Sequence, residues 1–225
     1  MPRALRSPVV AGVLGRLHAQ ADDEDPQVAQ RVRAREAQLG RRLPQEQRYE
    51  LYGEAPLSIT REVGQLLYLL ALSTRPRLIV EFGSSLGVST IYLAAAIRDG
   101  GGGTLITSEC HSQKVELASQ NLADAGLADL VELRSGDALH TLANIAEPID
   151  LVFLDGRNDL YLPILHLLEP RLLPSGLVVA DLSADDPDLL PYLEYVREPA
   201  RGYFSTTVPL DDGVELSTRE GDGRP

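Results

Sequence analysis

The segment Glu81-Phe-Gly83-Ser-Ser85-Leu-Gly87-Val-Ser89 decides the fold, because it follows a short apolar run and precedes a helix-length stretch. Glycine at positions 83 and 87 lets the backbone turn sharply and approach a ligand closely. The helix that follows would present free N–H groups and a positive dipole end to an anionic group. The pattern predicts a strand, a tight turn and a helix, either facing a ligand or simply joining two elements.

From Arg77 onward, short apolar runs alternate with helix-length segments. We expect strands at 78–82, 104–107, 130–133, 149–154 and 177–180, and helices at 88–98, 112–125, 138–145, 159–170 and 188–197. Five such units predict an α/β fold with a doubly wound, mostly parallel sheet and helices on both faces. Residues 203–209 and 214–218 flank an Asp-Asp-Gly hairpin signal, so we expect the sheet to end in an antiparallel pair.

The N-terminal part carries no convincing strand between residues 9 and 74. We expect a short amphipathic helix near 9–15, a helix from Pro26 to Gly40, and a third at 60–73 capped by Thr60. The chain is therefore divided into a helical N-terminal extension (1–55), a ligand-binding domain (56–220) and a tail (221–225).

Composition excludes several classes of protein. The chain has 225 residues, of which 44% are apolar and 24% charged, which is typical of a globular domain. Cys110 is the only cysteine, so a disulfide scaffold and a cysteine-based zinc site are excluded. No apolar run approaches the ~18 residues of a membrane span, and we expect a cytoplasmic protein. Lys114 is the only lysine available for catalysis.

Charge argues against a nucleic-acid partner. The net charge is −12, and residues 51–225 carry twelve Lys and Arg against twenty-six Asp and Glu, or −14. An acidic body repels phosphate backbones. We interpret one basic cluster as a solvated helix face rather than a binding patch: Arg31, Arg33, Arg35, Arg41 and Arg42.

Three carboxylates follow successive predicted strands: Glu109, Asp137 and Asp155. Each alone could be a solvated loop acid, but carboxyl ends of parallel strands meet at one edge of a sheet. A carboxylate after the second strand can accept hydrogen bonds from both ribose hydroxyls, so the set predicts a nucleoside-type ligand. The Gly83-x-x-x-Gly87 spacing departs from the dinucleotide pattern, and the loop suits a ligand without a pyrophosphate.

Four motifs together resemble the class I S-adenosylmethionine-dependent O-methyltransferases of the catechol and caffeoyl-CoA type. They are the segment 81–90, Gly136-Asp-Ala138, Asp150-Leu-Val-Phe-Leu-Asp155-Gly and Asp212-Gly-Val-Glu-Leu216. The lead-in 56–67 is also similar, so the likeness covers residues 50–220. It implies a Rossmann-like methyltransferase fold, S-adenosylmethionine as the cofactor and a small-molecule substrate.

The resemblance also implies residue roles. Glu81, Gly83, Ser85 and Ser89 would surround the methionine end, and Glu109 would bind the ribose. Asp137 would accept from the adenine amino group, with a backbone contact from Ala138. Asp155 would lie beside the transferred methyl group, and Glu215 matches a substrate-contacting acid. The implied catalytic residues are Asp155 and Asn158.

Two departures from the family bear on metal dependence. The family's metal ligands match Asp155, Asp181 and the next residue, which here is Leu182. The position of the family's catalytic lysine holds Asn158, and Lys114 lies on a different helix. We therefore expect no magnesium site, although Asp185 or Asp186 could supply a replacement ligand.

Several alternatives remain at this stage. His111 lies at the ligand edge, whereas we expect His140 to be exposed and His166 to be packed among leucines. Gly83-Ser-Ser85-Leu-Gly87 also satisfies the nucleophile-elbow pattern of α/β hydrolases, but only His166 follows Asp155. A methyltransferase fold with a rearranging, cyclising or regulatory role is a second alternative. We also expect a homodimer, with a contact through the first 50 residues.

Overall fold

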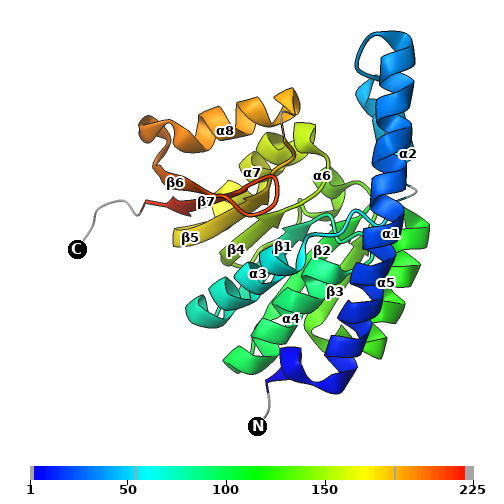
Figure 1. Cartoon of the computed structure of the whole chain (residues 1–225). Coiled ribbons are helices and arrows are strands. Elements are labelled where there is room, and N and C mark those ends of the chain that lie inside the picture. Colours follow the sequence, from blue (N-terminus) through cyan, green and yellow to red (C-terminus); the bar gives the residue numbers. More distant parts are fainter. Residues whose placement is uncertain (1–2, 54, 185, 221–225) are drawn as a thin grey trace.

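A seven-stranded sheet organises the chain in the computed structural model, which describes residues 3–53, 55–184 and 186–220. The strands lie in the order β3-β2-β1-β4-β5-β7-β6 (Figure 1). Their bounds are β1 Leu78–Phe82, β2 Thr104–Glu109, β3 Val131–Ser135, β4 Ile149–Leu154, β5 Leu172–Asp181, β6 Tyr203–Val208 and β7 Val214–Arg219. Pairs among β1 to β5 are parallel, and β7 is antiparallel to both β5 and β6, so the predicted architecture is confirmed.

Helices cover both faces of the sheet (Figure 1). One apolar core lies under α1, α3, α4 and α5, and the other under α6, α7 and α8. The helices are α1 Pro8–Leu39, α2 Gln45–Gly53, α3 Arg61–Thr74, α4 Val88–Gly100, α5 Ser112–Asp124, α6 Ala138–Thr141, α7 Tyr161–Leu168 and α8 Leu190–Arg197. The parallel order brings the carboxyl ends of β2, β1 and β4 side by side, which is where the site forms.

The N-terminal helix corrects the prediction of a helix beginning at Pro26. Instead, α1 is one 32-residue helix that contains Pro26, and its start is capped by the Ser7 hydroxyl. Proline in a helix interior costs about 3 kcal/mol. That cost is outweighed because one buried stripe continues on both sides of Pro26, and each buried aliphatic side chain contributes about 1.5–3 kcal/mol. The stripe comprises Val10, Val13, Leu14, Leu17, Ala21, Val28 and Val32.

A short helix that the sequence reading did not predict, α2, lies between Pro44 and the domain. None of its nine residues is buried, so it lacks the apolar stripe that reveals a helix in a sequence. Asp185 and the tail 221–225, both named above, lie outside the described residues. Among the described residues, no helix is long and apolar enough to cross a membrane.

Candidate functional site

The turn after β1 is held against the end of β4 at a position that only glycine can occupy. Gly83 has φ +93°, and a Cβ added there would lie 2.4 Å from the backbone oxygen of Asp155. The backbone N–H of Asp155 also donates to the oxygen of Phe82 at 2.9 Å. The glycine therefore fixes the two strand ends that border the site.

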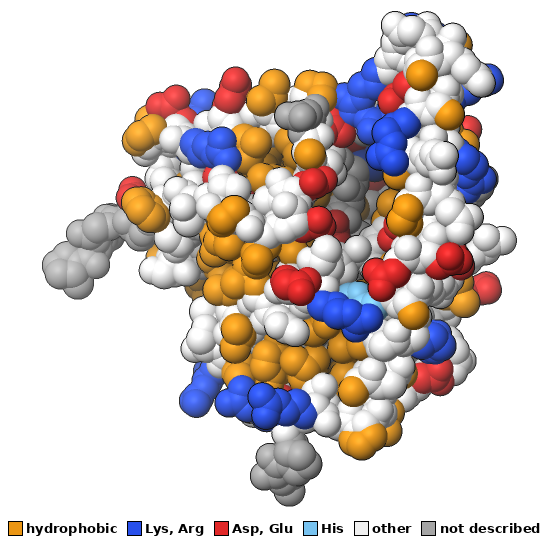
Figure 2. Space-filling view, in the orientation of Figure 1, with side chains coloured by type: hydrophobic (Ala, Val, Ile, Leu, Met, Phe, Trp, Pro, Cys, Tyr) orange, Lys and Arg blue, Asp and Glu red, His pale blue; other side chains and the backbone are white. Residues whose placement is uncertain are grey.

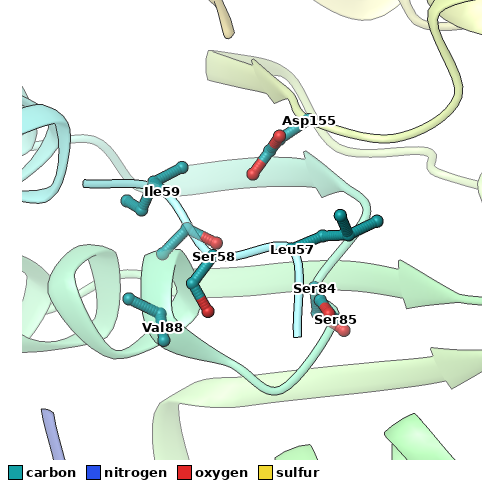
Figure 3. Close-up of a pocket in the computed structure, with 8 residues that line it drawn as sticks. Leu57, Ser58, Ile59, Ser84, Ser85, Val88 and Asp155 are labelled. Atoms are coloured by element: carbon teal, nitrogen blue, oxygen red, sulfur yellow. The ribbon is translucent and has the colours of Figure 1, made fainter. Parts of the chain in front are cut away.

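A small cavity, about 10 Å³ in volume, opens at these strand ends (Figure 3). We call residues 55–60, which line one side of it, the strap. The cavity is lined by Leu57, Ser58, Ile59, Ser84, Ser85, Val88, Ser89 and Asp155. Serine hydroxyls and the N-terminus of α4 suit a carboxylate, and the Asp155 carboxylate suits a cation, so the lining fits an amino-acid group.

The strap is anchored by a residue of α1. The backbone N–H groups of Leu57 and Ser58 donate to the Asp25 carboxylate at 2.8 and 3.2 Å. On the other side, the hydroxyl of Ser85 donates to the Pro56 oxygen. Burial raises the pKa of Asp25, and the two N–H groups oppose that rise. Sequence reasoning missed Asp25, because nothing local relates it to a loop thirty residues later.

Glu109 ends β2 with its side chain buried and its carboxylate aimed at the glycine turn. One oxygen accepts from the Ser85 N–H at 3.0 Å, and the other from the N–H groups of Cys110 and His111 at 2.9 Å. These three donors fix the orientation of the carboxylate. Lone pairs remain for further donors, as a ribose diol requires.

Lys114, which we expected to lie away from the chemistry, is buried in the first turn of α5. Burial lowers the pKa of Lys114, while the nearby charges of Glu109, Asp25 and, more weakly, Asp155 raise it. The single lysine therefore supplies positive charge among the acids around the cavity. Its place at the start of a helix that follows a ligand-side strand was the available signal.

Asp155 and Asp181 end the neighbouring strands β4 and β5 and interact strongly. Burial raises the pKa of Asp155, and the Asp181 charge raises it further. Burial together with Asp211 and Asp212 raises the pKa of Asp181 to about 7. One Asp181 oxygen is buried with no hydrogen-bond partner among the described residues. The pair therefore holds a proton near neutral pH.

The donors around this pair do not fit a family-type magnesium site. Magnesium prefers octahedral oxygen coordination, and the third ligand position holds Leu182, whose side chain lies near Gly213 in the β6–β7 turn. Among the described residues, the only close cluster of three potential metal-ligating side chains is Glu109, Cys110 and His111. Asp155 and Asp181 are therefore one oxygen ligand short of the family's magnesium site.

Asn158, at the position of the family's lysine, makes a hydrogen bond within the protein. Its amide donates to Asp186 at 3.0 Å, and Asp186 also accepts from Arg42 at 2.6 Å. Arg48 of α2 lies 3.5 Å from the other Asp186 oxygen. This corrects the interpretation of the basic cluster as wholly solvated, because Arg42 joins the end of α1 to the loop after β5.

Asp137 and Ala138 lie at the end of β3, as expected from the sequence. Asp137 caps α6, its carboxylate accepting from the Leu139 N–H at 3.0 Å and contacting His140 at 3.1 Å. Ala138 is buried in the core.

Glu81, at the end of β1, is fully buried and accepts from the Thr90 hydroxyl at 2.6 Å. It is not among the residues that line the cavity.

The contacts of Glu215 differ from the substrate-contacting role that the resemblance implies. Its buried carboxylate accepts two hydrogen bonds of 2.8 Å from Arg197 and one at 2.5 Å from Thr207. Burial raises the pKa of Glu215, but Arg197 and Thr207 outweigh that effect and lower it overall. All of this bonding is internal, so we do not carry Glu215 forward as a substrate contact.

The remaining histidines give no hydrolytic site. His140 is exposed as expected, with 86% of its side chain accessible. His166 is also exposed and packs edge-on against Tyr195, which corrects the expectation of a histidine packed among leucines. The Ser85 hydroxyl donates to a backbone oxygen rather than to a histidine. The hydrolase alternative therefore lacks its serine–histidine pair.

Comparisons with known proteins agree with this geometry. A family model described as a methyltransferase domain matches residues 80–181. A catechol O-methyltransferase of Niastella koreensis is 32% identical over 152 residues, 66% of this chain and 67% of the relative. A putative O-methyltransferase of a Mycobacterium species is 33% identical over 178 residues, 72% of this chain and 80% of the relative.

A solved structure points in the same direction. The O-methyltransferase TomG of Streptomyces achromogenes, determined with S-adenosylmethionine, is 28% identical with a TM-score of 0.66, covering 73% of this chain and 82% of TomG. The region that the family model matches, residues 80–181, contains the strand ends that border the cavity and the acids Glu109 and Asp155. The chain therefore belongs to the S-adenosylmethionine-dependent O-methyltransferase family.

Proposed function

We propose that this chain methylates a hydroxyl or carboxylate oxygen of a small molecule, with S-adenosylmethionine as the methyl donor and without a divalent metal ion. The cavity between the strap and the N-terminus of α4 carries the proposal (Figure 3). Glu109 lies at one end of this region, and the Asp155–Asp181 pair lies at the other.

Each residue then has a proposed part in holding the cofactor. Ser85 and Ser89 receive the methionine group, with Gly83 allowing the close approach, and Glu109 binds the ribose hydroxyls. Asp137 and Ala138, at the end of β3, contact the adenine. Glu81 supports the cofactor site indirectly, because its hydrogen bond with Thr90 fixes the first turn of α4.

When bound, S-adenosylmethionine supplies an electrophilic methyl group on a sulfonium. The negative charge that remains on the Asp155–Asp181 pair attracts that sulfonium and orients the substrate oxygen. Because burial raises the pKa of both carboxyl groups, the carboxylate of the pair that stays ionised is basic enough to accept the hydroxyl proton as the oxygen attacks. Enforced proximity supplies several kcal/mol of the remaining barrier reduction.

The chemistry around the cavity narrows the substrate class. Among the described residues, no third metal-ligating side chain joins Asp155 and Asp181 to hold an ion that would lower the pKa of a substrate hydroxyl. Asn158 is hydrogen-bonded to Asp186. A substrate with an acidic phenol, enol or carboxylic acid would bind partly ionised, so its oxygen would need neither a strong base nor a metal ion to remove a proton. Because relatives bear the name catechol O-methyltransferase, catechols belong in the first panel.

The test is production of S-adenosylhomocysteine by the purified protein with a panel of catechols, acidic phenols and aromatic acids. The proposal expects turnover with at least one acidic member and loss of at least tenfold in Asp155→Asn. Asp129→Asn, at an exposed acid of the short 3-10 helix Ala128–Leu130, is the matched control. Tight cofactor binding without transfer to any panel member would instead favour a rearranging, cyclising or regulatory role.

We further propose that the chain is a homodimer. Support comes from large apolar side chains left on the surface, among them Leu69 on α3, 58% exposed, and Phe204 on the edge strand β6, 68% exposed. Light scattering after gel filtration gives the mass directly. A dimer that Leu69→Glu or Phe204→Glu converts to monomers would locate the contact, and a monomeric wild-type protein would refute it.

A further inference from the structure

Tyr49 of α2 packs against side chains from two strand ends of the site. Its ring stacks on His111 with centroids 4.9 Å apart and an interplanar angle of 24°. The Arg157 guanidinium carbon lies 5.1 Å from the centre of the same ring, and the Tyr49 hydroxyl contacts the Cys110 sulfur. A planar aromatic ring of this chain is therefore held beside residues that follow Glu109.

The cofactor's covalent structure places its adenine in the same region. If the amino-acid group lies by Ser89 and Asp155 and the ribose lies at Glu109, the base leaves the ribose on the side away from the cavity. It then extends past Glu109 toward Cys110 and His111. Tyr49 occupies that region in the structure.

The volume of the cavity agrees with this placement. At about 10 Å³, it has room for about one water molecule and is far smaller than the roughly 300–1,000 Å³ of typical small-molecule sites. Its lining includes serines and Asp155 but neither Cys110 nor His111. The open space therefore stops short of the two residues that Tyr49 covers.

The helix that carries Tyr49 is weakly attached to the body. None of its nine residues is buried. Apart from the contacts of Tyr49, it is held by the ion pairs of Arg48, which lies 3.5 Å from Asp186 and 3.6 Å from Glu36. Segments with few buried contacts open at low free-energy cost. Figure 2 shows a hollow between the α1–α2 arm and the body, with basic side chains gathered on the arm's side.

We propose that Tyr49 is an internal occupant of the adenine position, and that cofactor binding requires displacement of α2. This inference rests on the proposed function. Cys110, His111 and Arg157 then contact Tyr49 in the closed form and the adenine in the open form. The closed form lowers the apparent affinity for the cofactor by the fraction of molecules that are open.

The experiment measures S-adenosylhomocysteine binding by calorimetry to the wild-type protein, Tyr49→Ala and Tyr49→Phe. Tyr49→Ala is expected to bind about tenfold more tightly, equivalent to about 1.4 kcal/mol. Tyr49→Phe, which keeps the ring, should stay within threefold of wild type. Tyr52→Ala, one turn along the same helix and against Arg48 rather than the strand ends, is the matched control and should also stay close to wild type.

The single cysteine gives a second readout that does not depend on affinity. Cys110 is exposed in the closed form, so the readout is protection by the ligand: saturating S-adenosylhomocysteine should slow iodoacetamide labelling of Cys110 in Tyr49→Ala several-fold. Equal or weaker binding by a folded Tyr49→Ala, or an unchanged labelling rate, overturns the inference while the proposed function stands. Absence of binding to every variant, with folding confirmed by circular dichroism, overturns both.

Discussion

The backbone N–H of Ser85 donates a 3.0 Å hydrogen bond to the carboxylate of Glu109. This bond joins the turn after β1 to the end of β2, so the loop that faces the amino-acid group and the acid that faces the ribose are positioned together. Ser85 is held there with φ +44°, an unusual conformation for a residue with a side chain. A shift of the turn at Ser85 would therefore also shift the carboxylate of Glu109.

Replacing Glu109 with alanine should weaken S-adenosylhomocysteine binding by about 1.5–3 kcal/mol, the range for hydrogen bonds to a charged group. Calorimetry measures the loss directly. Glu132→Ala, an exposed acid on β3, should leave binding unchanged. A thermal shift with NAD but none with S-adenosylmethionine would contradict the assignment of the cofactor.

Methyl transfer should survive excess EDTA and gain nothing from added magnesium. The physical reason is the donor set, in which Asp155 and Asp181 have Leu182 beside them instead of a third oxygen. Activity is measured against EDTA concentration in the wild type and in Leu182→Asn. Loss of wild-type activity with EDTA and recovery with magnesium would mean that another residue completes a metal site.

The stability of the protein should depend on pH through Asp181. Its pKa is about 7 in the folded chain and near 3.8 when unperturbed, so between these values the folded state binds more protons than the unfolded state. The free energy of unfolding therefore falls as pH rises from about 4 to about 7, and then levels off.

Asp181→Asn should reduce this slope, and at pH 8 it should be more stable than wild type by about 1–3 kcal/mol, since each pKa unit corresponds to about 1.4 kcal/mol. Urea unfolding at several pH values makes the measurement, with the exposed Asp129→Asn as the control. Equal slopes in Asp181→Asn and wild type would show that the charge of Asp181 is compensated.

Arg197→Ala should destabilise the fold by about 2–4 kcal/mol, because it leaves the buried Glu215 carboxylate with only the Thr207 hydroxyl. Cofactor affinity should not change, because Glu215 does not line the cavity. Denaturant melts and calorimetry separate the two effects. A stable Glu215→Gln variant that loses turnover would restore the substrate-contacting role implied by the family.

The sequence was informative wherever local patterns carry the structure. The apolar runs from Leu78 onward located the strands, since β-strands buried by helices on both faces read as short apolar segments. The acids at the strand ends followed from the same rule, and the structure brings Glu109 and Asp155 to one edge.

The features that the sequence did not predict depend on contacts between distant parts of the chain. Asp25 acts on the strap and Tyr49 acts on Cys110 and His111, and both contacts join residues far apart in the chain. Pro26 gave a misleading start signal, because the buried stripe of α1 runs through it and tertiary packing outweighs local preference.

The continuous helix α1 has a practical consequence for work with this protein. One rigid rod carries Val13 and Leu17, which seat it on the body, and Asp25, which holds the strap against the cavity. A shortened protein that starts after Asp25 would lack the carboxylate that anchors one wall of its cofactor pocket. Inactivity of such a protein would reflect the loss of that anchor and would say nothing about the chemistry of Asp155.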